Sequence, residues 1–205
     1  MKMIVVNCEQ GSEEWLAIRR GVITASEFSQ VMTPKMLKRA KTDYIYKLLA
    51  EFKGLAGDNF SSAAMDRGTN LEPVARELYA FREDVDPEQV GFIFLNESRL
   101  VGCSPDSLIG DDGGLEIKCP EAKAHIHYMM DDAVPDEYRS QVFGCLWLTG
   151  RSWWDFMSYH PKLPPLVTRV TNEDEGYKKW AECFEKILAE FIADYESMKE
   201  QLLAA

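Results

Sequence analysis

The sequence has no apolar run approaching the roughly 18 residues that a membrane-spanning helix needs. The apolar run in its first ten residues, MKMIVVNCEQ, is too short for a signal peptide. Five cysteines are scattered along the chain without any CxxC pair, namely Cys8, Cys103, Cys119, Cys145 and Cys183. We therefore expect a cytoplasmic protein without a membrane segment, whose cysteines are reduced, buried thiols and hold neither zinc nor an iron–sulfur cluster.

Basic residues are also scarce, since the sequence has 23 lysines and arginines but 34 aspartates and glutamates, which gives a net charge of −11. This balance on its face argues against a nucleic-acid partner. The deficit is uneven, however, because residues 1–60 hold 9 basic and 7 acidic residues, whereas residues 61–170 hold 10 and 18. Binding depends on local charge, so a positive groove near the N-terminus is compatible with the composition.

The length of 205 residues and the hydrophobic content of 46% suit one domain with a proper core, spanning residues 1–205. Helices capped by Ser12 and Ser26 come first, and the other predicted helices cover 43–53, a stretch opening at 68, 121–132, 135–148 and about 177–205. Predicted strands cover 90–95 and 153–159, on either side of a hairpin. This order indicates an α/β domain with a small mixed central β-sheet flanked by helices.

The hairpin at 99–120 is the most informative stretch. Its turn is predicted at 110–114 (GDDGG), and its second strand at 115–119 (LEIKC). If Ile109 pairs with Leu115, Asp106 lies opposite Lys118 and diagonal to Glu116, within reach of a shared ligand. Two carboxylates and a lysine beside an apolar strand are unusual in a core and natural in a metal site.

Two acidic ligands can hold Mg²⁺, which prefers oxygen donors and keeps several waters. Such an ion activates water and stabilises the charge that develops on a phosphate, while a neighbouring lysine orients or deprotonates the water. The residues of the hairpin therefore predict a metal-dependent phosphodiester hydrolase, with Asp106, Glu116 and Lys118 at its centre.

Residues before the hairpin offer further candidates. Arg19, Thr24 and Ser26 combine a guanidinium with small hydroxyls near a helix start, which suits a phosphate but also a routine cap. The basic run at 33–41 carries no acid, and it is either a solvated loop or a phosphate-contacting one. Its cations are Lys35, Lys38, Arg39 and Lys41.

Two polar side chains in predicted helices have both a structural and a functional interpretation. Glu72 has capping-box spacing from Thr69, at the start of a helix whose predicted core face is Leu71, Val74, Leu78 and Phe81. Gln141 interrupts an apolar stripe, so it is either a satisfied core residue or a residue of the same cleft as Asp106. His125 and His127 diverge on a helix, so a shared metal is not favoured.

The motifs also resemble a known family. Pro105-Asp106, nine residues and then Glu116-Ile117-Lys118 is the PD-(D/E)xK nuclease pattern. The runs RRGVITAS (19–26), GTNLE (68–72), CSPD (103–106), LEIKCP (115–120) and SQV (140–142) follow in the order seen in the phage lambda exonuclease family of viral-type alkaline exonucleases. The resemblance covers about residues 10–195 and implies a restriction-endonuclease-like core.

This resemblance implies a Mg²⁺-dependent, 5′→3′ exonuclease of linear duplex DNA that releases mononucleotides and leaves a 3′ overhang for recombination by strand annealing. Mn²⁺ is expected to substitute, with one or two ions per site. It further implies a processive homotrimeric ring around DNA, a single-strand annealing protein as partner, and a phage or prophage origin in a bacterial cytoplasm.

Carried over by position, Asp106, Glu116 and the backbone carbonyl of Ile117 match the metal ligands, and Lys118 matches the catalytic lysine. Glu72 matches a helical acid near the second metal position, and Gln141 a glutamine that positions the attacking water. The remaining matches are the 5′-phosphate pocket (Arg19, Thr24, Ser26, Ser104) and an apolar wedge at the terminal base pair (Met65). The basic loop 35–41 and residues 121–135 differ from the lambda protein in length and composition.

Three alternatives share features with this interpretation. A sequence- or structure-specific endonuclease could use the same hairpin, although no added recognition domain is evident. A nuclease with an iron–sulfur cluster would need clustered cysteines. A catalytically silent DNA-binding scaffold for recombination would not need the complete set of Asp106, Glu116 and Lys118.

Overall fold

The computed structural model describes residues 3–32, 38–55 and 63–204, with the side chains of all but 38–40 and 63–66. The elements in chain order are β1 (Ile4–Val6), α1 (Glu13–Ile18), β2 (Ile23–Thr24), the 3₁₀ turn η1 (Ala25–Glu27), α2 (Phe28–Val31), α3 (Lys38–Phe52), α4 (Ala63–Glu83), β3 (Pro87–Glu88), β4 (Phe92–Phe94), β5 (Val101–Cys103), β6 (Ser107–Ile109), β7 (Gly113–Lys118), α5 (Ala122–Asp131), α6 (Asp136–Thr149), β8 (Trp153–Ser158), β9 (Leu166–Thr171) and α7 (Glu175–Ala204).

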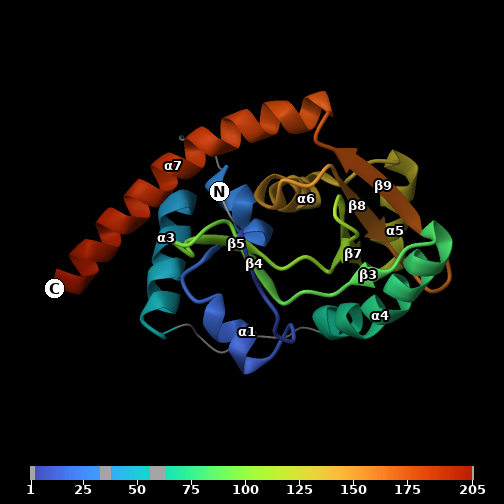
Figure 1. Ribbon diagram of the computed structural model, residues 1–205, viewed down its shortest axis with the longest axis horizontal. Helices are drawn as coiled ribbons and strands as arrows, with labels where there is room; N and C mark the ends of the chain where they lie inside the picture. Colours follow the sequence, from blue (N-terminus) through green and yellow to red (C-terminus); the bar gives the residue numbers. More distant parts are fainter. Residues whose placement is uncertain (1–2, 33–37, 56–62, 205) are drawn as a thin grey trace.

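The strands form two mixed sheets, ordered β1-β4-β5-β2 and β3-β6-β7-β8-β9. Pairing is parallel between β2 and β5 and between β7 and β8, and antiparallel elsewhere. Only Ser104, Pro105 and Asp106 separate β5 of the first sheet from β6 of the second. Figure 1 shows helices on both sides of these strands, with α4 and α7 on opposite sides. The predicted mixed α/β class is confirmed, with two sheets where one was expected.

The first helix begins as predicted, because the Ser12 hydroxyl accepts the Trp15 backbone N–H at 3.2 Å. The prediction that Ser26 caps a second helix is wrong. Ile23 and Thr24 instead form β2 against β5, and Ser26 lies within the following 3₁₀ turn. A cap needs extended backbone outside the helix, which this turn does not provide at Ser26.

The hairpin forms, but its register differs from the predicted one. Ser107 pairs with Leu115 and Ile109 pairs with Gly113, so the pairing is shifted by two residues. Gly113 and Gly114 belong to β7, where a Cβ would collide with the rings of Trp153 and Trp154 on β8. A shift of two preserves the face of every side chain, so Glu116 and Lys118 still lie on one face of β7.

The helix that carries Glu72 begins at Ala63, well before its predicted start at Gly68. Glu72 is therefore an interior helical residue, and the capping box with Thr69 is wrong. The predicted core face is also wrong in part, because Val74 and Phe81 are 48% and 87% exposed. The buried face carries Ala75 and Tyr79, which pack against the second sheet.

The four edge strands of the two sheets, β1, β2, β3 and β9, were not predicted, and α3 begins earlier than the predicted residue 43. The predicted helices at 121–132, 135–148 and 177–205 correspond to α5, α6 and α7, and the strands at 90–95 and 153–159 to β4 and β8. No helix in the described ranges is long and apolar enough to cross a membrane.

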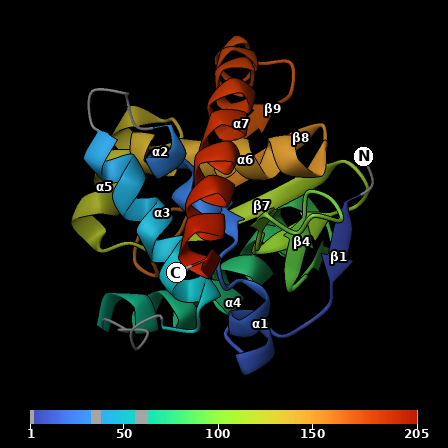
Figure 2. The same ribbon diagram turned by 90° about the vertical axis from the view of Figure 1, so that its left-hand side faces the viewer.

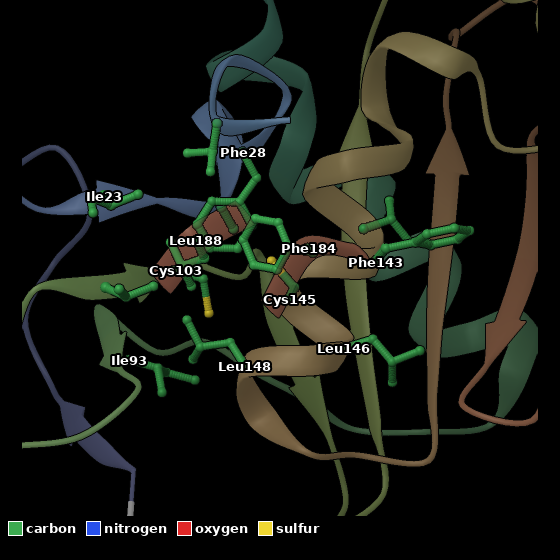
Figure 3. Close-up of a cluster of buried hydrophobic side chains, with 14 of the residues drawn as sticks. Ile23, Phe28, Ile93, Cys103, Phe143, Cys145, Leu146, Leu148, Phe184 and Leu188 are labelled. Carbon is green, nitrogen blue, oxygen red and sulfur yellow. The ribbon is translucent and has the colours of Figure 1, made fainter. Parts of the chain in front are cut away.

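The largest core cluster joins residues of both sheets to helices α2, α3, α6 and α7. Figure 3 shows Ile23, Phe28, Ile93, Cys145, Phe184 and Leu188 gathered there. The rings of Phe28 and Phe184 lie 4.4 Å apart. Helix α7 crosses α6 and ends beside α3, as Figures 1 and 2 show. The core thus fixes α6 and the strands that bear the candidate site.

Candidate active site

Asp106 lies directly before β6. Because Ser107 pairs with Leu115, one further step of the same register places Asp106 opposite Glu116. Its Oδ2 atom accepts the backbone N–H of Ile117 on β7 at 2.6 Å. This charge-assisted bond across the hairpin fixes the orientation of the carboxylate.

Glu116 lies on β7 and is only 1% exposed. Its Oε1 atom accepts from Lys118 Nζ and from Gln141 Nε2, each at 2.5 Å. No donor in the part of the chain that the structure describes reaches its second oxygen, Oε2, which is buried. A buried carboxylate oxygen without a partner is costly, so a cation beside it would stabilise the site.

The acids and the lysine shift one another's pKa. Burial raises the pKa of Asp106 well above its usual range, and the Glu116 carboxylate raises it further. Burial also raises the pKa of Glu116, although Lys118 offsets part of this effect. Burial lowers the pKa of Lys118, but the two carboxylates raise it by more, so its net shift is upward. Burial and mutual repulsion thus disfavour the ionised form of both carboxyls, and a bound cation would favour it.

A cleft of about 440 Å³ opens beside these groups. Glu72, Asp106, Ile117, Lys118 and Tyr138 line it, together with Arg67, Gly68, Cys119, Pro120 and Glu121. Helix α4 supplies one wall through Glu72, and β7 supplies the other. The structure therefore brings the helical acid and the hairpin to one cleft, and Gln141 joins them through Glu116.

The donor set can be tested against a divalent cation. No three acidic, histidine or cysteine side chains within residues 3–32, 38–55 and 63–204 form a ready-made metal cage. The available oxygen donors are the carboxylates of Asp106 and Glu116, and the backbone carbonyl of Ile117 is expected beside them. Among the described residues, no hydrogen-bond donor reaches the second oxygen of Glu116. Oxygen donors that leave room for several waters suit Mg²⁺ better than zinc or a cluster. The residues fit such an ion.

The predicted phosphate-binding residues divide into two adjoining pairs. Arg19 Nη1 donates to Ser104 Oγ at 3.1 Å, and the hydroxyls of Thr24 and Ser26 lie 3.1 Å apart. Thr24 pairs with Gly102 in the parallel β2–β5 ladder, so both pairs lie at the same end of these strands. Ser104 is two residues from Asp106, which places the pair beside the acidic site.

Sequence reasoning missed Trp15, which contacts both members of the Arg19–Ser104 pair. Its Nε1 atom donates to Ser104 Oγ at 3.0 Å, and the Arg19 guanidinium lies 3.9 Å from its ring centroid. The spacing of four residues between Trp15 and Arg19 on a helix was the available signal, because such residues are neighbours. Arg76 and Ser107 were also missed, and they contact Glu72 and Asp106 respectively.

The remaining candidates are less well placed. Lys35 lies outside the described residues, and so do the side chains of Lys38, Arg39 and Met65. Lys41 forms an ion pair with Asp194 of α7 at 3.0 Å, so its contact with DNA stays a prediction.

The two histidines of α5 diverge. His125 is fully buried, with its ring nitrogens 2.7 Å from Ser158 Oγ and 3.0 Å from the Pro164 carbonyl. His127 lies at the surface beside Asp131. Both ring nitrogens of His125 are therefore engaged within the fold.

The chain is similar to known viral recombinases and exonucleases. The sequence pattern of the YqaJ-like viral recombinase domain matches residues 14–152. The crystal structure of LHK-Exo in complex with dAMP has a TM-score of 0.78 and 35% identity, covering 94% of this chain and 99% of that chain.

A second structure of LHK-Exo, an alkaline exonuclease from Laribacter hongkongensis, matches over the same shares at 34% identity and a TM-score of 0.78. A phage-related exonuclease from Haemophilus somnus 129PT matches at 11% identity and a TM-score of 0.64, covering 88% of this chain and 96% of that chain, and it shows the shared fold alone. No curated protein matches the sequence.

Proposed function

The chain belongs to the YqaJ-like viral recombinase domain family, and from this premise we propose that it is a Mg²⁺-dependent 5′→3′ exonuclease of linear duplex DNA. The observation that carries the proposal is the adjacency of two sites. The Arg19–Ser104 pair and the Asp106–Glu116 pair are joined by the three-residue link between β5 and β6. A phosphodiester bond close to a 5′-phosphate can therefore lie at the acids while that phosphate is bound.

Each residue of the site has a role in this chemistry. Asp106, Glu116 and the carbonyl of Ile117 would hold the ion, and Glu72 would help to hold a second one. A bound Mg²⁺ supplies Lewis acidity and a water of lowered pKa. Gln141 and Lys118 hold Glu116 and orient the attacking water, and the Lys118 ammonium offsets charge on the phosphate.

The proposed reaction is hydrolysis. The water oxygen attacks phosphorus, the bond from phosphorus to the 3′ oxygen breaks, and that oxygen takes up a proton. The released mononucleotide has a free 3′-hydroxyl, and the shortened strand has a new 5′-phosphate. This phosphate can enter the Arg19 pocket, so each cycle regenerates the group that the pocket recognises.

The pocket is chemically suited to a terminal phosphate. A guanidinium presents several donors in a plane and binds phosphate oxygens in pairs. Arg19 already donates to a hydroxyl and stacks on Trp15, so it is held in place before any ligand arrives. Thr24 and Ser26 add hydroxyl donors nearby.

Digestion of three substrates tests the proposal. The enzyme with Mg²⁺ should release mononucleotides from 5′-phosphorylated linear duplex, more slowly from unphosphorylated duplex, and none from closed circles. Cleavage of closed circles would favour the endonuclease, and no cleavage at all would favour the silent scaffold. Arg19→Ala should reduce the preference for a 5′-phosphate selectively, whereas Asp106→Ala and Lys118→Ala should abolish release from every end.

The assembly is proposed on the resemblance to the lambda exonuclease family. We expect a homotrimeric ring that encloses the duplex and is therefore processive, with Mn²⁺ able to replace Mg²⁺. A single-strand annealing protein is the expected partner, in the cytoplasm of a bacterium carrying a phage or prophage. Lys35, Lys38, Arg39, Lys41 and Met65 are proposed to contact DNA in this assembly.

A further inference from the structure

Arg76 is a buried cation that contacts Glu72 of the cleft and Ser107, the residue after Asp106. The residue is 9% exposed and lies on α4, one turn after Glu72. Its Nη2 atom forms an ion pair with Glu72 Oε1, and its Nε atom donates to Ser107 Oγ at 3.0 Å. The side-chain amide of Gln89 is taken in the orientation that turns its oxygen toward the donors of Arg76. In this orientation the oxygen accepts from both terminal nitrogens of Arg76 at 3.2 Å.

Ser107 extends this contact chain to the hairpin. Its hydroxyl accepts from Arg76 and lies 2.6 Å from the backbone carbonyl of Asp106, to which it donates. The chain of contacts therefore runs from Glu72 on α4, through Arg76 and Ser107, to the residue that carries the first acid. Glu72 and Asp106 both line the cleft, whereas Arg76 and Ser107 lie behind it.

Helix α4 has a separate anchor on the second sheet. Tyr79 Oη donates to Asp155 at 2.7 Å, and Arg169 holds the same carboxylate with two bonds. Ala75 and Tyr79 also pack on the second sheet. The attachment of the helix thus does not depend on Arg76 alone, and the guanidinium is the group that ties the Glu72 side chain to the hairpin.

We propose that Arg76 is a positioning residue that fixes the Glu72 carboxylate relative to Asp106, so that the cleft holds a divalent cation. The inference rests on the proposed function, because it assigns Glu72 to the ion. The planar guanidinium can bind a carboxylate and a hydroxyl at once, which a lysine at this position could not reproduce. Partners of metal ligands commonly change metal affinity by about 10- to 100-fold when they are removed.

Binding of Mn²⁺ without DNA, measured by electron paramagnetic resonance of the free ion, tests this role independently of activity. Arg76→Met should weaken binding by about 10-fold or more, and so should Glu72→Gln. The double variant should bind like Glu72→Gln alone, because Arg76 acts through that carboxylate. Arg82→Met is the matched control on the same helix, with a side chain 49% exposed, and it should bind like the wild type.

Unchanged binding in Arg76→Met, or losses that multiply in the double variant, would overturn the role of Arg76. If Arg76→Met does not fold, Ser107→Ala removes one contact of the guanidinium with little change of volume. It should weaken Mn²⁺ binding, and unchanged binding would count against the proposal. A wild type that binds no Mn²⁺, or an Asp106→Asn variant that binds it as well as wild type, would instead overturn the proposed nuclease site and this inference with it.

Discussion

In the metal-free protein, the Asp106 carboxyl lowers the free energy of unfolding. Its pKa is raised by burial and by the nearby Glu116 carboxylate, while the Ile117 N–H and Lys118 offset only part of this. A carboxyl whose folded pKa lies above its unfolded value costs nothing at a pH below the unfolded pKa, near 4. The destabilisation grows as the pH rises from the unfolded pKa to the folded pKa and is constant above it, because in that window the unfolded chain is ionised while the folded carboxyl still holds its proton. Asp106 thus lowers the stability of the fold at the place where we propose that a cation binds.

Asp106→Asn should therefore stabilise the metal-free protein while it abolishes nuclease activity. The asparagine oxygen can still accept the Ile117 N–H, and the buried negative charge is removed. We expect a gain on the order of 1 kcal/mol at pH 8 that shrinks as pH falls toward 4. Thermal unfolding in the presence of EDTA at several pH values measures it. A lower Tm than wild type at pH 8 would show that the ionised carboxylate stabilises the fold.

At the scale of elements, β7 determines the geometry of the site through two glycines. Gly113 and Gly114 lie beside Trp153 and Trp154 in the parallel β7–β8 ladder, and the indole rings occupy the space where a Cβ would be. The rings can lie across β7 only because these positions lack side chains. The same strand carries Glu116 and Lys118, so the packing of the tryptophans against β7 affects the position of these two side chains.

Gly114→Ala should destabilise the protein by about 1–3 kcal/mol, because the added methyl forces Trp154 or the strand to move. Nuclease activity should fall as well, since Glu116 follows two residues later. Denaturant unfolding and a digestion assay measure the two effects. Gly176→Ala is the control, since the added methyl meets no atom within 4 Å and suits the α7 helix. Equal unfolding free energies for Gly114→Ala and wild type would contradict this account of the hairpin.

These glycines also show what could be predicted from the sequence. They were assigned to the turn because glycine tolerates positive φ, and their contact with tryptophans 40 residues later leaves no local signal. The acids and the lysine were still found, because a register error of two residues preserves side-chain alternation. The helix around Glu72 was predicted, but its start was not, since capping spacing also occurs by chance inside a helix. Contacts between distant segments, such as Arg76 with Ser107 and Trp15 with Ser104, required the structure.

On the scale of the whole molecule, the last helix contacts the segment that follows Arg19, a proposed phosphate-binding residue. Helix α7 passes over α6 and reaches the region of α3, as Figure 1 shows. Tyr195 Oη donates to the Gly21 carbonyl at 3.1 Å, and the Gly21 N–H donates to Glu51 of α3 at 3.2 Å. Gly21 has φ +69°, a conformation that favours glycine. Two helices thus fix the backbone two residues after Arg19.

Removing the Tyr195 hydroxyl should therefore weaken recognition of the DNA end more than the chemistry. In Tyr195→Phe the ring stays in the core but the buried Gly21 carbonyl loses this donor, so the loss of stability should be about 1–3 kcal/mol. The KM for 5′-phosphorylated duplex should rise several-fold while kcat stays near wild type, because Tyr195 contacts Gly21, whereas Glu116 lies on β7 and Asp106 directly before β6. Tyr177→Phe, on the same helix and packed on Phe143, is the matched control and should leave KM unchanged. A fall in kcat with unchanged KM would mean that α7 supports the hairpin and not the phosphate pocket, and equal KM values for the two variants would remove Tyr195 from end recognition altogether.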